Sequence, residues 1–185
     1  MIVIVIPAKG SSGRLANKNM APINGRPMID YALDDALASR RAQAVYVSTD
    51  SDAIAAHAIS RGVPVVRRPE SLGGDVPIVE VYRHALAHIP DGDKVSVLVG
   101  LQPDHPDRNL TVDESIAIFE REGADVLDSQ EAAGVKNGAH YVLSRHFLKT
   151  GEARAKTTVI DDCTNIHFEN DLKRAAARLA ERARS

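Results

Sequence analysis

The hydrophobic pattern of this chain alternates between short apolar runs and longer segments whose apolar residues recur at helical spacing. The first run, Met1 to Ile6, is rich in β-branched residues and shows no polar alternation, which predicts a strand buried on both faces. Further strands are predicted at residues 44–50, 63–68, 94–103, 125–127 and 140–143. Helices are predicted at residues 28–39, 52–61, 78–88, 112–122 and 170–184.

This order of elements predicts the fold class. Strands that alternate with helices through short loops favour an α/β fold, a doubly wound and mostly parallel sheet with helices on both faces. We expect one domain over residues 1–185, because no repeat, low-complexity linker or composition break divides the chain. Ligands of such sheets bind beyond the carboxyl ends of the strands, so the loops after Ile6, Asp50 and Gln102 are the candidate site.

Composition excludes several function classes. Charged residues make up 26% of the chain and the net charge is −2, without the basic excess expected of a nucleic-acid binder. Trp is absent and aromatic residues are 4%, which argues against stacking platforms for single strands. The first apolar run is too short for a membrane span and lacks the basic start of a signal peptide, so we expect a cytoplasmic protein with no membrane partner. The lone Cys163 rules out an internal disulfide.

The loop after the first strand combines small residues with cations. Small residues let the backbone approach a ligand and aim its N–H groups at it, and lysine or arginine supplies charge for an anion such as a polyphosphate. The spacing matches neither standard phosphate-binding fingerprint, so on spacing alone a plain surface turn is an equal alternative. The residues concerned are Ala8, Lys9, Gly10, Ser11, Ser12, Gly13, Arg14, Lys18 and Asn19.

The same loop, IPAKGSSGRLANKN, resembles the signature IPARGGSKRLPxKN of the N-acylneuraminate cytidylyltransferases. Lys9 stands where this family has Arg, and Ser11, Gly13 and Ala16 depart from its pattern. Later segments continue the resemblance in the family's order: NGRPMIDYAL (24–33), VYVSTDSDAI (45–54), RRPESLGGD (67–75) and NGAHYVLSRHFL (137–148). The resemblance therefore covers the chain from Met1 to about Leu148, and it implies the nucleotide-diphospho-sugar transferase-like variant of the Rossmann fold.

The activity that the resemblance implies is CMP transfer from CTP. An acceptor oxygen attacks the α-phosphorus in line and pyrophosphate leaves, a displacement that depends on positioning and charge neutralisation. The implied catalytic cations are Lys9, Arg14 and Lys18, which would hold the phosphates. The implied nucleotide-binding residues are Ala8, Gly10, Ser11, Ser12, Asn19, Arg68, Asp75 and Gln102. Arg68 and Asp75 flank a glycine-rich turn, for which a solvated surface turn is the alternative interpretation.

A metal ligand is expected in the segment LQPDHPDR (101–108). The N-acylneuraminate enzymes read LQPTSPLR there, whereas the related 3-deoxy-manno-octulosonate cytidylyltransferases read QGDEP. Asp104 thus takes the place of the second group's acidic residue. A carboxylate at the end of a central strand suits Mg²⁺ (or Mn²⁺), and an exposed loop Asp is the alternative.

The family's second metal motif matches poorly. Its pattern DIDTxxDL corresponds here to NIHFENDL (165–172), so that Asn165 and His167 replace the acidic pair. Because Mg²⁺ prefers oxygen ligands, these two residues are partial candidates for the metal site. The possible compensating carboxylates nearby are Asp161, Asp162 and Glu169.

The acceptor is the least defined part of the predicted reaction. The N-acylneuraminate enzymes carry a longer excursion that forms the dimer contact and part of the sugar pocket, whereas here only DVLDSQEAAGVK (125–136) joins two strands. We therefore expect a shortened dimerisation and acceptor arm near residues 128–137, a possible homodimer, and a small acidic acceptor such as a nonulosonic or other sugar acid. A phosphonate acceptor, a different nucleoside triphosphate and a non-catalytic nucleotide-binding relative are the alternatives.

Some polar residues have a structural interpretation that competes with a functional one. The strand end Ser48–Asp50 is interpreted as the cap of the next helix rather than as a ligand contact. His84 and His88 have the spacing of a helical metal pair, but without a third ligand an exposed helix face is favoured. His140 is expected to face either the acceptor or solvent, and Cys163 has no evident role.

Overall fold

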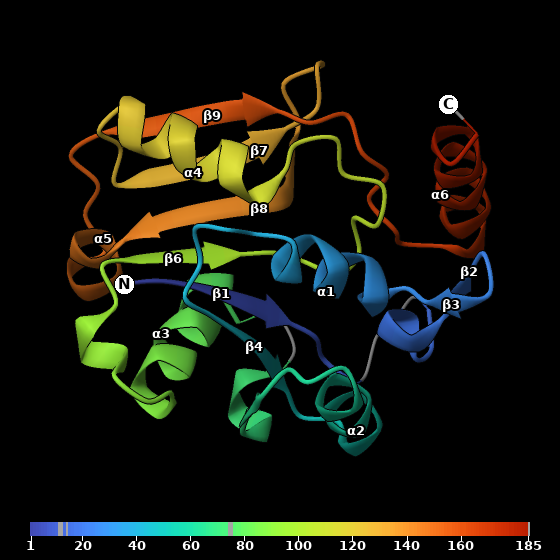
Figure 1. Ribbon diagram of the computed structural model, residues 1–185, viewed down its shortest axis with the longest axis horizontal. Helices are drawn as coiled ribbons and strands as arrows, with labels where there is room; N and C mark the ends of the chain where they lie inside the picture. Colours follow the sequence, from blue (N-terminus) through green and yellow to red (C-terminus); the bar gives the residue numbers. More distant parts are fainter. Residues whose placement is uncertain (11–12, 14, 74–75, 185) are drawn as a thin grey trace.

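The computed structural model describes residues 1–10, 13, 15–73 and 76–184. Its centre is a seven-stranded sheet in the order β5-β4-β1-β6-β8-β7-β9 (Figure 1). Its strands are β1 (Ile2–Pro7), β4 (Ala44–Thr49), β5 (Val65–Arg67), β6 (Val97–Gly100), β7 (Val126–Gln130), β8 (Lys136–Ser144) and β9 (Lys156–Ile160). A two-stranded ribbon pairs β2 (Pro22–Ile23) with β3 (Arg26–Pro27).

Helices connect most of these strands. The α-helices are α1 (Ile29–Leu37), α2 (Asp52–Ser60), α3 (Ile78–His88), α4 (Val112–Arg121), α5 (Arg145–Thr150) and α6 (Glu169–Arg182). The 3₁₀ turns are η1 (Lys18–Met20), η2 (Glu70–Leu72) and η3 (Gly92–Lys94).

The direction of the strands confirms the predicted fold class. β1 is parallel to its neighbours β4 and β6, β5 is parallel to β4, and β9 is parallel to β7. β8 is the reversed strand, antiparallel to both β6 and β7. The result is a mostly parallel sheet in which the carboxyl ends of β1, β4, β5 and β6 meet at one edge.

β1 shows why the sheet lacks a polar face. Ile4 and Ile6 belong to the apolar cluster formed with α1, α2 and α4, whereas Val3 and Val5 belong to the cluster formed with α3 and α5. All four side chains are completely buried. The unbroken apolar run is therefore the pattern that a strand covered on both faces requires.

Among the α-helices and the strands of the main sheet, α5 and β9 were not predicted from the sequence. The short helix α5 begins after Ser144, whose hydroxyl accepts the N–H of Phe147 at 3.1 Å. The edge strand β9 buries only Val159 among its five residues, so it lacks the apolar pattern by which strands are recognised. The strands predicted at 125–127 and 140–143 extend further than expected, and they are joined by residues 131–135.

The last helix, α6, packs beside the β2–β3 ribbon rather than on the main sheet (Figure 1). Ile23, Met28, Ile166 and Ala175 form a small buried cluster between them. This packing holds the segment before α6 close to the edge of the sheet where β1 and β6 end.

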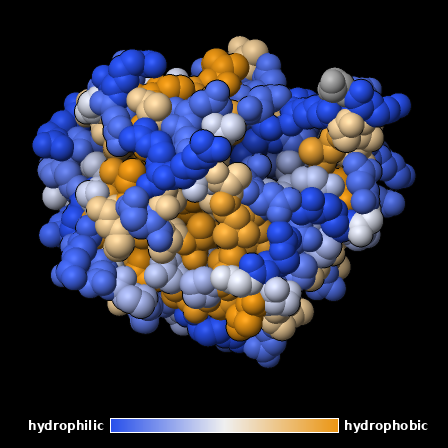
Figure 2. All heavy atoms as spheres, viewed as in Figure 1, coloured by the Kyte–Doolittle hydropathy of each residue, from blue (hydrophilic) through white to orange (hydrophobic). Residues whose placement is uncertain are grey.

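The face of the molecule in Figure 2 is largely hydrophilic, with hydrophobic side chains gathered near its centre. Exposed large apolar residues include Leu37 on α1 and Ile59 on α2, which are 49% and 63% exposed. Within the described ranges, no helix has the length and apolar character that crossing a membrane requires.

Candidate active site

A cavity of about 150 Å³ lies where the carboxyl ends of the central strands meet. Loops from four parts of the chain line it: the loop after β1, the turn η1, the segment after β5 and the segment after β6. Its apolar wall comes from η2, α3 and Val76, which lies in the segment between them. The sequence-predicted site residues that line the cavity are Lys9, Lys18, Asn19, Arg68, Gln102 and Asp104.

Arg68 is the most unusual of these residues because its charged group is buried without full compensation. The side chain is only 4% exposed, and among the described residues Nε and Nη2 have no hydrogen-bond partner. The nearest carboxylate oxygen, Asp50 Oδ1, lies 4.0 Å from Nη2. Burial lowers the pKa of Arg68, although Asp50 opposes this. A buried guanidinium with unused donors has the chemistry to bind an anion.

Lys18 and Asp104 form an ion pair on the same cavity. Lys18 Nζ donates to Asp104 Oδ2 at 2.7 Å and to the carbonyl oxygen of Ile166 at 3.1 Å. Burial acts to raise the pKa of Asp104, but His105 and Lys18 lower it well below its ordinary value. Asp104 is therefore an ionised carboxylate in a largely buried position, not an exposed loop residue.

The loop after β1 is held by hydrogen bonds that use several of its predicted ligand-binding groups. The N–H of Gly10 donates to Asp50 Oδ1 at 2.7 Å, and the side-chain amide of Asn19 donates to the carbonyl of Lys9 at 2.9 Å. Ala8 is completely buried and its N–H donates to the carbonyl of Ser48. These groups build the loop, and Lys9 and Lys18 line the cavity. The other predicted binding residues of this region, Ser11, Ser12, Arg14 and Asp75, lie outside the described residues.

The predicted metal candidates line two different hollows. Asp104 lines the small cavity, whereas Asn165 and His167 line a groove of about 770 Å³ beside α6. The two sites are adjacent, because the N–H of Ile166 donates to the carbonyl of Asp104 at 2.9 Å. The N–H of His167 donates to Asp171 Oδ2.

Oxygen donors rather than a histidine cluster are available for a cation. Asp104 Oδ1 and Asn165 Oδ1 are buried and accept no hydrogen bond from the described residues, although His105 Nδ1 lies 3.0 Å from Asp104 Oδ1. No group of three or more His, Cys, Asp or Glu suited to a metal occurs in the part of the chain that the structure describes. This donor set fits a hard divalent cation that takes its remaining ligands from phosphate oxygens and water.

The three compensating carboxylates considered from sequence are not gathered at Asp104. Glu169 is an exposed residue of α6 whose Oε1 lies 3.9 Å from Lys173 Nζ, and the other two are engaged elsewhere. Asp161 is 1% exposed and accepts hydrogen bonds from Asn109 and the N–H of Leu110. Asp162 Oδ1 accepts the N–H of Ala132 at 2.7 Å.

Two residues that sequence reasoning did not single out hold the segment 101–108 in place. Asp107 is completely buried; it accepts hydrogen bonds from Thr164 and pairs with Arg178 Nε at 2.9 Å. Arg108 donates to the carbonyls of Ala139 and Gln102. The only sequence signal for Asp107 was an acidic residue where the similar family has Leu.

Two local interpretations are corrected by the structure. Ser51, not Ser48–Asp50, caps α2 through its bond from the N–H of Ile54, and Asp50 binds the loop after β1 instead. His140 faces neither acceptor nor solvent, since it is completely buried with Nε2 3.3 Å from Asp161 Oδ2.

The remaining histidine and cysteine predictions concern residues outside this cavity. The rings of His84 and His88 stack at 4.1 Å. Burial raises the pKa of the Cys163 thiol to about 12, which leaves it protonated.

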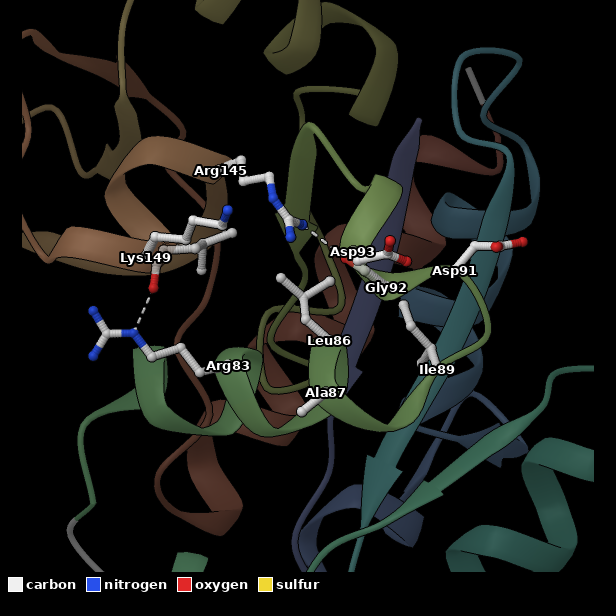
Figure 3. Close-up of a pocket in the computed structure, with 10 residues that line it drawn as sticks. Arg83, Leu86, Ala87, Ile89, Asp91, Gly92, Asp93, Arg145 and Lys149 are labelled. Carbon is white, nitrogen blue, oxygen red and sulfur yellow. Dashed lines mark hydrogen bonds between the residues drawn. The ribbon is translucent and has the colours of Figure 1, made fainter.

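A further cavity of about 450 Å³ lies between α3, η3 and α5 (Figure 3). There Arg145 donates to the carbonyl of Gly92 at 2.8 Å, and Arg83 Nε donates to the carbonyl of Leu148 at 2.7 Å. This cavity lies near the amino end of β6, and none of the sequence-predicted site residues line it. The candidate site is therefore the smaller cavity at the opposite end of that strand.

Curated proteins of one family are similar in sequence to this chain. The N-acylneuraminate cytidylyltransferase of Escherichia coli O18:K1:H7 is 33% identical over 121 residues, covering 64% of this chain and 28% of that protein. The 8-amino-3,8-dideoxy-manno-octulosonate cytidylyltransferase of Shewanella frigidimarina is 31% identical over 141 residues, covering 70% of this chain and 56% of that protein. The chain thus matches from about a quarter to about half of the length of these relatives.

Comparison with solved structures supports the same fold. The structure of CMP:2-keto-3-deoxy-manno-octonic acid synthetase complexed with CTP superposes with a TM-score of 0.79 at 16% identity, covering 98% of this chain and 99% of that one. The sequence profile described as cytidylyltransferase matches residues 3–106, more than half of the chain. The resemblance found in the loop motifs is confirmed, and the chain belongs to the cytidylyltransferase family.

Proposed function

We propose that this chain is a CTP-dependent nucleotidyltransferase that transfers CMP to a small acidic acceptor and releases pyrophosphate. The observation that carries the proposal is the buried guanidinium of Arg68, with unused donors, in a cavity also lined by Lys9 and Lys18. The described lining of this cavity holds three cations and one carboxylate, Asp104, so its excess positive charge favours a polyanion. The names of the relatives support CTP as the nucleotide, since each is a cytidylyltransferase.

The residues of the cavity have distinct roles in this reaction. The acceptor oxygen attacks the α-phosphorus of CTP, the bond from that phosphorus to the bridging oxygen breaks, and pyrophosphate leaves. Lys9, Lys18 and Arg68 hold the phosphates and neutralise charge that develops on the leaving oxygens. Arg14 is a further candidate for this role from the motif that the loop resembles. Gln102 lies on the cavity wall, where it is a candidate contact to the ribose or the acceptor.

A divalent cation, Mg²⁺ or Mn²⁺, would supply further neutralisation of the phosphate oxygens when bound. Asp104 is the residue best suited to hold it, and Asn165 is the candidate second oxygen donor in the adjacent segment. Lys18 donates to the other carboxylate oxygen, Oδ2, so the ion pair keeps this carboxylate charged.

The acceptor class follows from the relatives and from the short connection between β7 and β8. The relatives are named for two sugar acids, N-acylneuraminate and an amino-dideoxy-octulosonate, which share a carboxylate. Residues 131–135 form a tight turn in which the N–H of Glu131 donates to the carbonyl of Val135. This short turn leaves out the longer arm of the similar family, which supports a small sugar acid or a phosphonate as acceptor. A homodimer and a cytoplasmic location are part of the proposal.

The test is pyrophosphate release from CTP with Mg²⁺ or Mn²⁺ and a panel of sugar acids and phosphonates. We expect release that depends on both the acceptor and the cation, and tighter binding of CTP than of UTP, GTP or ATP in parallel titrations. CTP binding without turnover for any acceptor would favour a non-catalytic nucleotide-binding relative. A preference for another nucleoside triphosphate would contradict the cytidylyl assignment.

A further inference from the structure

His105 contacts Asp104, whose carboxylate belongs to the candidate active site, but does not itself line the cavity. Its side chain is completely buried, and Nδ1 lies 3.0 Å from Asp104 Oδ1. Neither ring nitrogen makes a hydrogen bond of good geometry to a described residue. Among the described residues, the Asp104 carboxylate is the charged group that lies beside the imidazole. The similar family has Ser at this position, so the contact is a feature of this chain rather than of the shared motif.

The two oxygens of Asp104 are therefore restrained from opposite sides. Lys18 Nζ contacts Oδ2 at 2.7 Å and His105 Nδ1 contacts Oδ1 at 3.0 Å. The terminal torsion of an aspartate is broad, so a carboxylate held at one oxygen alone turns readily about that contact. A buried partner at the second oxygen removes this freedom, and small misplacements of a catalytic group are costly.

We infer that His105 is a positioning residue, which fixes the carboxylate of Asp104 against Lys18 on the wall of the nucleotide cavity. This inference rests on the proposed function, because it assigns His105 a task in holding a group of that site. A purely packing role is the competing account, and it requires only the volume of the ring.

Two substitutions separate these accounts. His105→Leu replaces the imidazole with an apolar side chain of similar volume and so removes both ring nitrogens. His105→Asn instead places an amide nitrogen near the position of Nδ1. We expect His105→Leu to lower kcat for pyrophosphate release about 10–100-fold, as loss of an orienting partner typically does, with a change in the KM for CTP of less than about 3-fold. His105→Asn is expected to recover at least about half of the wild-type kcat, although it fills the space less well.

The matched control is His140→Leu. His140 is also a completely buried histidine beside a carboxylate, Asp161, but it does not line the cavity. We expect His140→Leu to change the midpoint of thermal unfolding without the selective loss of kcat. Equal losses of kcat in both leucine variants would overturn the positioning role, as would wild-type kcat in His105→Leu.

A spectroscopic measurement tests the contact without turnover. In protein labelled with ¹⁵N-histidine, the His105 ring signals are identified by their loss in His105→Asn. At fixed pH, Asp104→Asn is expected to shift the Nδ1 signal of His105, whereas the exposed Asp162→Asn leaves it in place. An unmoved Nδ1 signal in Asp104→Asn contradicts the inference.

The outcomes also separate the inference from the proposed function. An inactive Asp104→Asn together with a fully active His105→Leu defeats the positioning role alone. A fully active Asp104→Asn defeats the role proposed for Asp104 and with it the inference. If the wild-type protein releases no pyrophosphate with any acceptor, the proposed function fails, and the ring signal still decides whether His105 holds Asp104.

Discussion

The N–H of Gly10 donates to the carboxylate of Asp50 at 2.7 Å, and this bond joins the loop after β1 to the end of β4. The same Oδ1 atom lies 4.0 Å from Arg68 Nη2, so one carboxylate orients both the loop backbone and the buried guanidinium. The approach is close, because a Cβ on Gly10 would lie 2.8 Å from Ser51 Cβ. Asp50 therefore shapes the cavity although it does not line it.

Removing this carboxylate is expected to weaken nucleotide binding. Asp50→Ala frees the loop and leaves Arg68 without its nearest counter-charge, so the Kd for CTP should rise about 10-fold, which corresponds to about 1.4 kcal/mol. Asp50→Asn keeps an oxygen that accepts from Gly10 and should lie closer to wild type. The control is Asp52→Asn, whose side chain is 96% exposed. Titration calorimetry with CTP measures the affinity of each variant. Equal affinity of Asp50→Ala and wild type would show that the bond between Gly10 and Asp50 does not shape the site.

We expect Arg68 to lower the free energy of unfolding and to strengthen the binding of CTP. Arg68→Met removes a buried cation with unused donors, so the free energy of unfolding should rise by about 1 kcal/mol. The same change should weaken CTP binding by about 10- to 100-fold, because bonds to charged groups contribute about 1.5–3 kcal/mol.

The neighbouring Arg67→Met is the control for the Arg68 prediction. The Arg67 side chain is 53% exposed and does not line the cavity, so CTP affinity should stay unchanged. Urea unfolding and CTP titration of both variants measure the two effects separately. A stable Arg68→Met with unchanged CTP affinity would remove the argument that this cavity binds an anion.

The sequence was most informative where one local pattern determines the outcome. The uninterrupted apolar run of β1 predicted a strand covered on both faces, which the burial of Val3 and Ile4 on opposite sides confirms. The gathering of Lys9, Arg68 and Asp104 in one cavity was predictable as well. These residues follow parallel strands, and the carboxyl ends of parallel strands meet at one edge.

Contacts between distant residues were the part that local patterns did not determine. An aspartate between a strand and a helix can either cap the helix or bind a neighbouring loop, and the sequence around Asp50 is the same in both cases. Only the position of Gly10 in three dimensions shows that Asp50 binds the loop. The pairing of Asp107 with Arg178 depends on where α6 packs, which no periodicity in the sequence encodes. The contact of His105 with Asp104 likewise depends on the path of the loop in three dimensions.

Gly100 at the end of β6 should tolerate no side chain. A Cβ there would lie 2.1 Å from the Oη atom and 2.3 Å from the Cζ atom of Tyr82, which is completely buried. Gly100→Ala must displace this ring from a packed core, so it should lower the free energy of unfolding by about 1–3 kcal/mol. The double variant with Tyr82→Leu should lose less than the sum of the single changes. Gly13→Ala is the control, since apart from its chain neighbours no atom of the described residues lies within 4 Å of its Cβ position. Unchanged thermal unfolding of Gly100→Ala would contradict the packing described here.

The buried pair of His140 and Asp161 predicts a loss of stability in acid. Burial lowers the pKa of His140 below its ordinary 6.5, with Asp161 opposing the shift. Burial acts to raise the pKa of Asp161, but His140 and Asn109 lower it to about 2, below the ordinary 3.8. For both groups the unfolded chain binds protons at a pH where the folded chain does not, so stability rises with pH in those windows. The contribution of His140 is complete above 6.5 and declines as the pH falls below that value, and that of Asp161 declines from 3.8 towards about 2.

Thermal unfolding between about pH 7.5 and about pH 5 tests the histidine window, because Asp161 does not titrate there. The unfolding midpoint of the wild-type protein should fall across this range, by about 2–4 °C for each kcal/mol lost. His140→Leu should show a shallower fall, because the group that takes up a proton only on unfolding is gone. His84, whose pKa burial also lowers, contributes to the slope that remains in that variant. Parallel slopes for wild type and His140→Leu would mean that the buried imidazole does not stay neutral in the folded protein.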